Sequence, residues 1–209
     1  MSLYRLLQSP FIYDLKTRIL SFGRRNVRDY LLGTPIARSA DSRILDVGCG
    51  TGRHAAISPG FFWGIDLNPR YIRHARKCYP GTFLVMNATH LAFSGDRFDL
   101  VFCAGLCHHL SDNDVRTTAR EMIRVTKQGG QVLIIDGVFP TKANFLGRLL
   151  FTFDRGHHTR TLETLATLLA QEGFELITEN IEGSFPYRRA VFSHRKPGNA
   201  EPLLGITDR

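Results

Sequence analysis

A run of alternating glycines preceded by an acid is the clearest binding motif in the chain. Gly48, Gly50 and Gly52 alternate in the segment ILDVGCGTG, and Asp46 stands before the first of them. Glycine accepts positive φ and close approach to its backbone, so this run predicts a sharp turn from a strand into a helix. The unpaired N–H groups at the start of that helix would point at whatever lies over the loop. The segment therefore predicts a ligand cradle at the carboxyl end of a strand.

Two further polar positions narrow the choice of ligand. Asp66 ends a second apolar run in GIDLNP, and Asn87 with Ala88 follows a third. An acid at the end of the second strand can accept hydrogen bonds from ribose hydroxyls, and a short amide can meet an adenine edge. The glycine run lacks the GxGxxG spacing of a pyrophosphate cradle, and Asp46 would repel phosphate but suit a cation. Together these positions favour a cationic adenosyl ligand.

Histidines and cysteines follow the fourth apolar run, in the segment AGLCHHL. His108 or His109 could act as a general base, because histidine titrates near neutrality; a structural role beside the ligand is the alternative. Cys103 and Cys107 could join them as metal ligands, but strand geometry points several of these side chains apart, so we expect no metal site. The cysteines form no CxxC pair, which indicates buried, reduced thiols rather than a disulfide frame.

Strand and helix patterns alternate from residue 43 onward. Strands are expected at 43–47, 61–66, 82–86, 98–103 and 131–136. Helices are expected between them at 53–57, 69–79 and 112–126, the last closed by Gly129 and Gly130. A later helix at 161–172 should precede a hairpin of two strands, 174–181 and 189–194. This order predicts an α/β, Rossmann-like sheet of seven mostly parallel strands, with an antiparallel C-terminal hairpin strand and helices on both faces.

Length and composition predict one soluble domain. The chain has 209 residues and an ordinary globular composition, and we expect a single domain over 1–196 with a flexible tail at 197–209. No apolar run approaches the roughly 18 residues of a membrane span. The first residues also lack the pattern of a signal peptide, so we expect a cytoplasmic protein.

The net charge of +8 is concentrated in two segments. Residues 1–30 carry six basic and two acidic side chains on a helical apolar pattern, which predicts a helical N-terminal lid that could also touch a membrane surface. Residues 137–160 carry four basic and one acidic side chain and interrupt the alternation, which predicts a substrate-lid insert. An anionic partner near these segments is expected; a solvated basic surface is the alternative.

The motifs resemble those of the class I S-adenosylmethionine-dependent methyltransferases, and most closely the branch that acts on small molecules. The resemblance covers residues 43–136 and rests on the order and spacing of ILDVGCGTG, GIDLNP, Asn87-Ala88, FDLVFCAGLCHHL and VTKQGGQVLIID. It implies S-adenosyl-L-methionine as the cofactor. The family commonly has Asp where this chain has Asn87, whose amide oxygen can still accept from adenine.

The resemblance also implies roles for individual residues around that cofactor. The glycine loop would hold the methionine part, Asp66 the ribose hydroxyls, Leu67 the adenine face and Asn87 with Ala88 the adenine edge. The residues expected to bind the cofactor are Asp46, Gly48, Cys49, Gly50, Gly52, Asp66, Leu67, Asn87, Ala88, Cys103 and Ala104.

The acceptor is expected to lie where the two lids meet the sheet. Arg155 or Arg160 could hold a carboxylate or phosphate through two parallel hydrogen bonds; an Asp–Arg pair capping the helix at 161–172 is the alternative. The residues expected to bind the acceptor are Tyr13, Asp154, Arg155, His157 and Arg160.

These inferences predict methyl transfer to a small molecule that has an apolar body and an anionic group. The sulfonium activates the methyl group, so the enzyme would align the reactants for in-line displacement and exclude water. The charge suggests a tRNA or rRNA methyltransferase as an alternative, but the aromatic and basic interleaving of nucleic-acid binders is missing. A non-catalytic partner protein that binds the cofactor is a second alternative.

Overall fold

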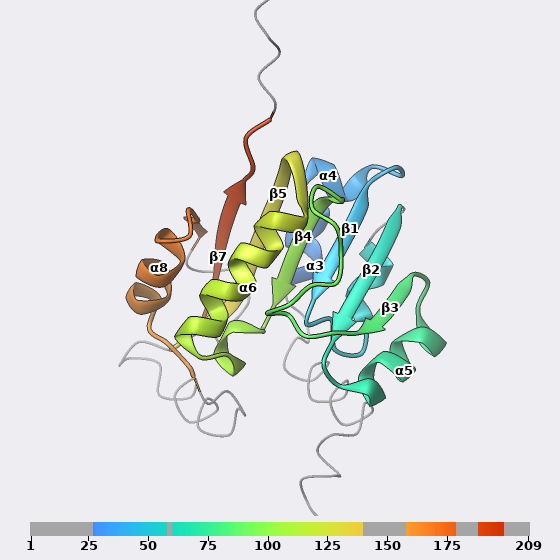
Figure 1. The fold of residues 1–209 in the computed structure, drawn as a ribbon, viewed down its shortest axis with the longest axis horizontal. Coiled ribbons are helices and arrows are strands. Elements are labelled where there is room, and N and C mark those ends of the chain that lie inside the picture. The colour runs from blue at the N-terminus through green and yellow to red at the C-terminus, as the bar shows by residue number, and fades with distance from the viewer. Residues whose placement is uncertain (1–26, 58–59, 140–157, 179–187, 199–209) are drawn as a thin grey trace, which may run out of the picture.

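A computed structural model describes residues 27–57, 60–139, 158–178 and 188–198, and Figure 1 shows their arrangement. Seven strands form one sheet with helices on both faces, which confirms the predicted Rossmann-like fold. The predicted lids and tail lie largely outside these ranges, as do Tyr13, Asp154, Arg155 and His157. No described helix is long and apolar enough to cross a membrane.

The sheet has the strand order β3-β2-β1-β4-β5-β7-β6. Its strands are β1 (Arg43–Val47), β2 (Phe61–Asp66), β3 (Thr82–Val85), β4 (Phe98–Ala104), β5 (Thr126–Val138), β6 (Glu175–Thr178) and β7 (Arg188–Arg195). Neighbours from β3 to β5 pair in parallel, and β7 pairs antiparallel with both β5 and β6. The C-terminal hairpin is therefore at the sheet edge, as predicted.

The helices divide between the two faces of the sheet. Helices α6 (Asp112–Val125) and α8 (Leu162–Ala170) pack on one face through a core that includes Met122 and Leu169. On the other face, α3 (Val27–Leu32), α4 (Pro35–Arg38) and α5 (Pro69–Cys78) pack through a second core that includes Leu31 and Ile72. Two short 3-10 helices, η1 (Arg53–Ile57) and η2 (Cys107–His109), follow β1 and β4.

The helix before β5 ends earlier than the sequence predicted. Gly129 and Gly130 do not close it: α6 stops at Val125, and Thr126 adopts an extended conformation at the start of β5. Thr126 pairs with Phe98, and the pairing shifts register before Leu100, so the two glycines lie in a bulge within the strand. Gly129 has φ 74° there. The pairing of Thr126 with β4 thus begins where the helix ends, and the glycines allow the bulge.

Candidate active site

The glycine loop is held against the end of the neighbouring strand. The N–H groups of Gly48 and Cys49 both donate to the carbonyl of Ile65, each over 2.8 Å. Gly48 and Gly52 have φ values of 76° and 83°, in the left-handed region that favours glycine. A Cβ on Gly52 would lie 2.7 Å from that of Ala75, so the loop also needs glycine there for close packing on α5.

Asp66 joins this loop to the end of β2. Its Oδ2 accepts the N–H of Gly50 over 2.9 Å, and its Oδ1 accepts the N–H of Asn68 over 2.8 Å. Burial raises the pKa of the Asp66 carboxyl. The next side chain, Leu67, is 71% exposed and is the most exposed large apolar residue described. A carboxylate beside an exposed apolar surface suits the ribose and the adenine face of an adenosyl group.

The loop after β3 lies beside the loop after β2. The N–H of Met86 donates to the main-chain carbonyl of Asp66 over 3.1 Å. Asn87 and Ala88, which follow Met86 in the chain, therefore lie near the end of β2. Asn87 Oδ1 accepts the N–H of Thr89 over 3.0 Å. A carbonyl oxygen has two lone pairs, so this contact still allows the amide to meet an adenine edge.

Asp46 forms a buried pair with His54, which the sequence analysis did not single out. His54 Nδ1 lies 3.0 Å from Asp46 Oδ2, and both side chains are almost fully buried. Among the described residues, Asp46 Oδ1 has no hydrogen-bond partner. A buried carboxylate oxygen without a donor is costly, so the site suits a ligand that brings a cationic N–H group. An acid two residues before GxGxG and a histidine two residues after it would have been the available sequence signal.

A second Asp–His pair lies near the carboxyl ends of β4 and β5. His108 Nδ1 is 2.7 Å from Asp136 Oδ1, and the N–H groups of Cys107 and Gly137 also donate to this carboxylate. Burial alone would raise the pKa of Asp136, but the charge and hydrogen bond of His108 and the two backbone donors lower it below its ordinary 3.8. The ring of His109 lies 4.1 Å from that of His108. Sequence analysis did not single out Asp136, although the strand expected at 131–136 ends on it just as the strand expected at 61–66 ends on Asp66.

Arg160 lies in the protein interior, where it holds the turn that carries these histidines. Its Nε and Nη2 donate to Asp112, and its remaining N–H groups reach the carbonyls of Cys107, Leu110 and His158. All five guanidinium donors therefore have protein acceptors. The structure thus places Arg160 as an internal clamp that includes an Asp–Arg pair, rather than as an open anion site.

The two cysteines of this region lie under the site. Cys103 is buried in the core on the α6 face, whereas the next residue, Ala104, is partly buried on the opposite face. A hydrogen bond with Cys103, together with burial, raises the pKa of Cys107 well above its usual value. No cluster of three or more metal-ligating side chains occurs in the described ranges.

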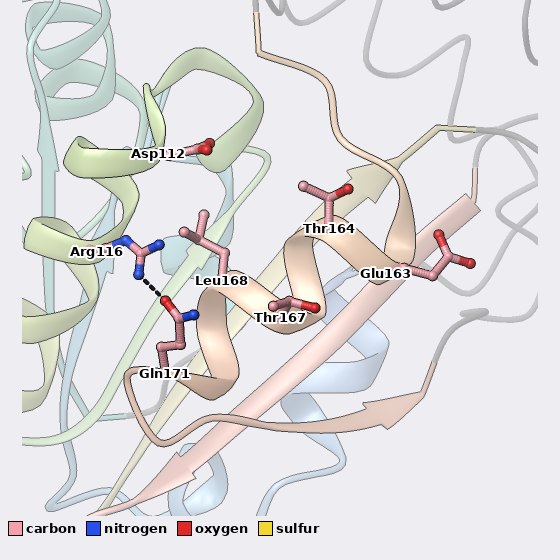
Figure 2. A pocket seen from close by; sticks show the side chains of 7 residues that line it. All are labelled: Asp112, Arg116, Glu163, Thr164, Thr167, Leu168 and Gln171. Carbon is pink, nitrogen blue, oxygen red and sulfur yellow. Dashed lines mark hydrogen bonds between the residues drawn. The ribbon is translucent and has the colours of Figure 1, made fainter.

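An open pocket of about 380 Å³ lies between α6 and α8 (Figure 2). Its lining residues are Asp112, Arg116, Glu163, Thr164, Thr167, Leu168 and Gln171. Arg116 donates to Gln171 across it. Its lining includes none of the described residues that follow β1, β2 or β3, so we do not assign the cofactor to it.

Comparison with known proteins identifies a methyltransferase domain. The family model described as a methyltransferase domain matches residues 44–130. A demethylmenaquinone methyltransferase of Streptomyces avermitilis is 32% identical over 141 residues, which cover 64% of this chain and 58% of the relative. A tRNA (carboxymethyluridine(34)-5-O)-methyltransferase of Arabidopsis thaliana is 36% identical over 95 residues, which cover 44% of this chain and 23% of the relative. The chain thus spans less than two thirds of either relative.

A solved structure shares the fold. The YcgJ protein from Bacillus subtilis superposes with a TM-score of 0.62 at 21% identity, over 80% of this chain and 98% of that chain. The matched domain contains the glycine loop, Asp66, Asn87 and the histidine turn, all at the same edge of the sheet. Residues 44–130 are therefore a methyltransferase domain, its sheet has the fold of the solved relative, and S-adenosylmethionine is the cofactor that such a domain implies.

Proposed function

We propose that the protein transfers a methyl group from S-adenosylmethionine to a small-molecule acceptor that must lose a proton. The observation that carries this proposal is the imidazole of His108, which Asp136 holds at 2.7 Å. It lies at the carboxyl ends of β4 and β5, the same sheet edge as the glycine loop after β1. An oriented histidine beside a methyl donor suits an acceptor hydroxyl or an acidic carbon.

The residues of the cradle would bind and orient the cofactor. Asp46 and the loop of Gly48, Gly50 and Gly52 would hold the methionine part, Asp66 the ribose, and Leu67 with Asn87 and Ala88 the adenine. Cys49, Cys103 and Ala104 would line the wall beneath. When bound, S-adenosylmethionine supplies a methyl group activated by its sulfonium, so the protein needs mainly to align the acceptor in line and exclude water.

His108 would accept the proton that the acceptor releases. A carboxylate at Nδ1 favours the tautomer with hydrogen on Nδ1, which puts the ring's lone pair on Nε2. The same carboxylate stabilises the imidazolium that forms when Nε2 takes up the proton. Asp136 would thus orient His108 without itself binding the proton. His109, the other histidine expected as a base, would pack against the His108 ring.

The acceptor is proposed to have an apolar body and an anionic group. This rests on the apolar and basic character of segments 1–30 and 137–160, where Tyr13, Asp154, Arg155 and His157 remain candidate contacts. Similarity to a demethylmenaquinone methyltransferase, whose name describes an apolar acceptor, supports a small molecule. We assign Arg160 to positioning instead, because its guanidinium donors already have partners.

A tRNA acceptor is the second candidate. It is favoured by the similarity to a tRNA methyltransferase of Arabidopsis thaliana and by the net charge of +8. Neutralising several phosphates would make such binding fall steeply as salt rises, whereas a single anionic group on a small molecule gives a shallow salt dependence.

The test is transfer of a radiolabelled methyl group from S-adenosylmethionine at two salt concentrations. The acceptors are apolar phenols and quinols with and without a carboxylate, and bulk tRNA. We expect transfer to the carboxylated small molecules with little effect of salt. Transfer to tRNA alone, with a steep loss at high salt, would contradict the proposal, and cofactor binding without transfer to any acceptor would favour the non-catalytic partner.

A further inference from the structure

We propose that His54 is a positioning residue of the donor site, which holds Asp46 turned so that its second oxygen receives the α-ammonium group of S-adenosylmethionine. The inference rests on the assignment of this cradle to that cofactor. It adds a residue outside the glycine motif, on the short helix η1, to the machinery that selects the amino-acid end of the donor.

The geometry gives Asp46 one satisfied oxygen and one unsatisfied oxygen. Asp46 is fully buried, Oδ2 is 3.0 Å from His54 Nδ1, and no described donor reaches Oδ1. The His54 ring is itself 7% exposed and packs edge-on against Phe102, with ring centroids 5.7 Å apart. The imidazole therefore has a fixed orientation, and so does the carboxylate it contacts.

A buried carboxylate that no donor held could turn away from its position. The hydrogen bond from His54 Nδ1–H fixes one oxygen of Asp46, which leaves the other ready for an incoming cation. The orientation of the carboxylate is set before the ligand arrives, so binding does not have to supply it.

The surroundings of the loop also favour a cation. Burial raises the pKa of the Cys49 thiol, and the negative charges of Asp46 and Asp66 raise that pKa further. Cys49 therefore stays neutral. Asp66 is engaged by the N–H groups of Gly50 and Asn68. The unsatisfied Oδ1 of Asp46 is therefore the acceptor at this loop that has the greatest need of a donor.

The test compares two ligands in two variants by isothermal titration calorimetry. S-adenosylhomocysteine carries the α-ammonium group, whereas 5′-methylthioadenosine lacks the whole amino-acid part. His54→Leu keeps an apolar side chain of similar size but no donor, and His54→Asn restores a short N–H donor. We expect His54→Leu to bind S-adenosylhomocysteine about tenfold more weakly, with 5′-methylthioadenosine affinity unchanged. His54→Asn should recover most of the loss.

The outcomes separate the inference from its premise. Equal weakening of both ligands, or unchanged affinity for S-adenosylhomocysteine in a folded His54→Leu, would overturn the role of His54. Failure of the wild-type protein to bind either ligand would instead overturn the assignment of the cradle. In an Asp46→Asn background, His54→Leu should cause no further loss, because the partner through which His54 acts is gone.

A measurement on the wild-type protein keeps the inference testable if His54→Leu fails to fold. In ¹⁵N NMR spectra of the imidazole nitrogens, His54 should show the tautomer with hydrogen on Nδ1. Its shifts should change when S-adenosylhomocysteine is added and change little with 5′-methylthioadenosine. The opposite tautomer, or identical changes with both ligands, would contradict the inference.

Discussion

The two buried Asp–His pairs differ in how completely the protein satisfies their carboxylates. Asp46 and Asp136 project from opposite faces of the sheet, next to the cores of α5 and α6 respectively. Asp136 accepts from His108 and from the N–H groups of Cys107 and Gly137, so both of its oxygens have partners. Asp46 accepts from His54 through one oxygen only.

This difference teaches how to separate a positioning carboxylate from a ligand-binding one. Asp136 is fully buried and accepts three hydrogen bonds from the protein, so it can orient its histidine without needing a ligand. A buried acid with one oxygen unsatisfied is incomplete without a ligand. We therefore assign the Asp136 pair to the acceptor reaction and the Asp46 pair to the donor.

Removing the imidazole of His108 should have the largest effect. His108→Asn keeps a donor to Asp136 but removes the base, so kcat should fall by roughly 10²–10⁴-fold while the Kd for S-adenosylhomocysteine is unchanged. His109→Asn is the matched control, and its kcat should fall far less. Steady-state kinetics over a pH series and calorimetry on both variants make the measurement. Equal losses in the two variants would remove the distinction between the neighbouring histidines.

Removing the Arg160 clamp should have the next largest effect, mainly on stability. Arg160→Ala leaves Asp112 and three carbonyls, of which that of Cys107 is buried, without their donor, so we expect the free energy of unfolding to fall by about 3 kcal/mol. For a chain of this size, the melting temperature should drop by roughly 10 °C. Arg120→Ala is the control, because Arg120 makes an exposed ion pair with Glu172 and should have little effect.

Calorimetric or thermal unfolding of both arginine variants checks this expectation. An unchanged melting temperature in Arg160→Ala, together with a higher KM for an anionic acceptor, would restore Arg160 as an acceptor-binding residue. It would also weaken the assignment of the His108 turn as a rigidly held element.

The smallest effect should be the loss of affinity for the adenosine part of the cofactor as the pH is lowered. The raised pKa of Asp66 means that burial makes its ionised form less stable in the ligand-free protein than the ionised form of a solvent-exposed Asp. Affinity for 5′-methylthioadenosine should therefore be full well above that pKa and fall as the pH drops through it, starting above the ordinary 3.8. Calorimetry between neutral and acidic pH measures this loss. A flat profile in the wild-type protein would argue against ribose contact by Asp66.

Much of the cradle could be predicted because its signals are local. Each signal stands at or just after the end of a strand: the alternating glycines follow β1, Asp66 ends β2, and Asn87 follows β3. Parallel strands bring their carboxyl ends to one edge of the sheet. The mostly parallel sheet and its antiparallel hairpin were likewise predicted from the alternation of patterns, whereas the strand order comes from the structure. The end of α6 was not, because Gly129 and Gly130 look like a helix stop until the pairing of Thr126 with Phe98 is known.

The pairs that complete the site could not be predicted in the same way. His54 meets Asp46 only because η1 turns back beneath the glycine loop, and Asp136 meets His108 only because β5 lies beside β4. Arg160 was expected at the acceptor because it ends a basic insert. Its partners are mostly backbone carbonyls, which carry no signal in the side-chain sequence.

The most direct test of the division between the two pairs is the calorimetric Kd for S-adenosylhomocysteine in Asp46→Asn and His108→Asn, measured side by side. Asp46→Asn removes the charge proposed to face the α-ammonium group, so its affinity should fall by at least about tenfold. His108→Asn should bind as tightly as the wild-type protein. Equal affinities in the two variants, or a loss confined to His108→Asn, would contradict the account.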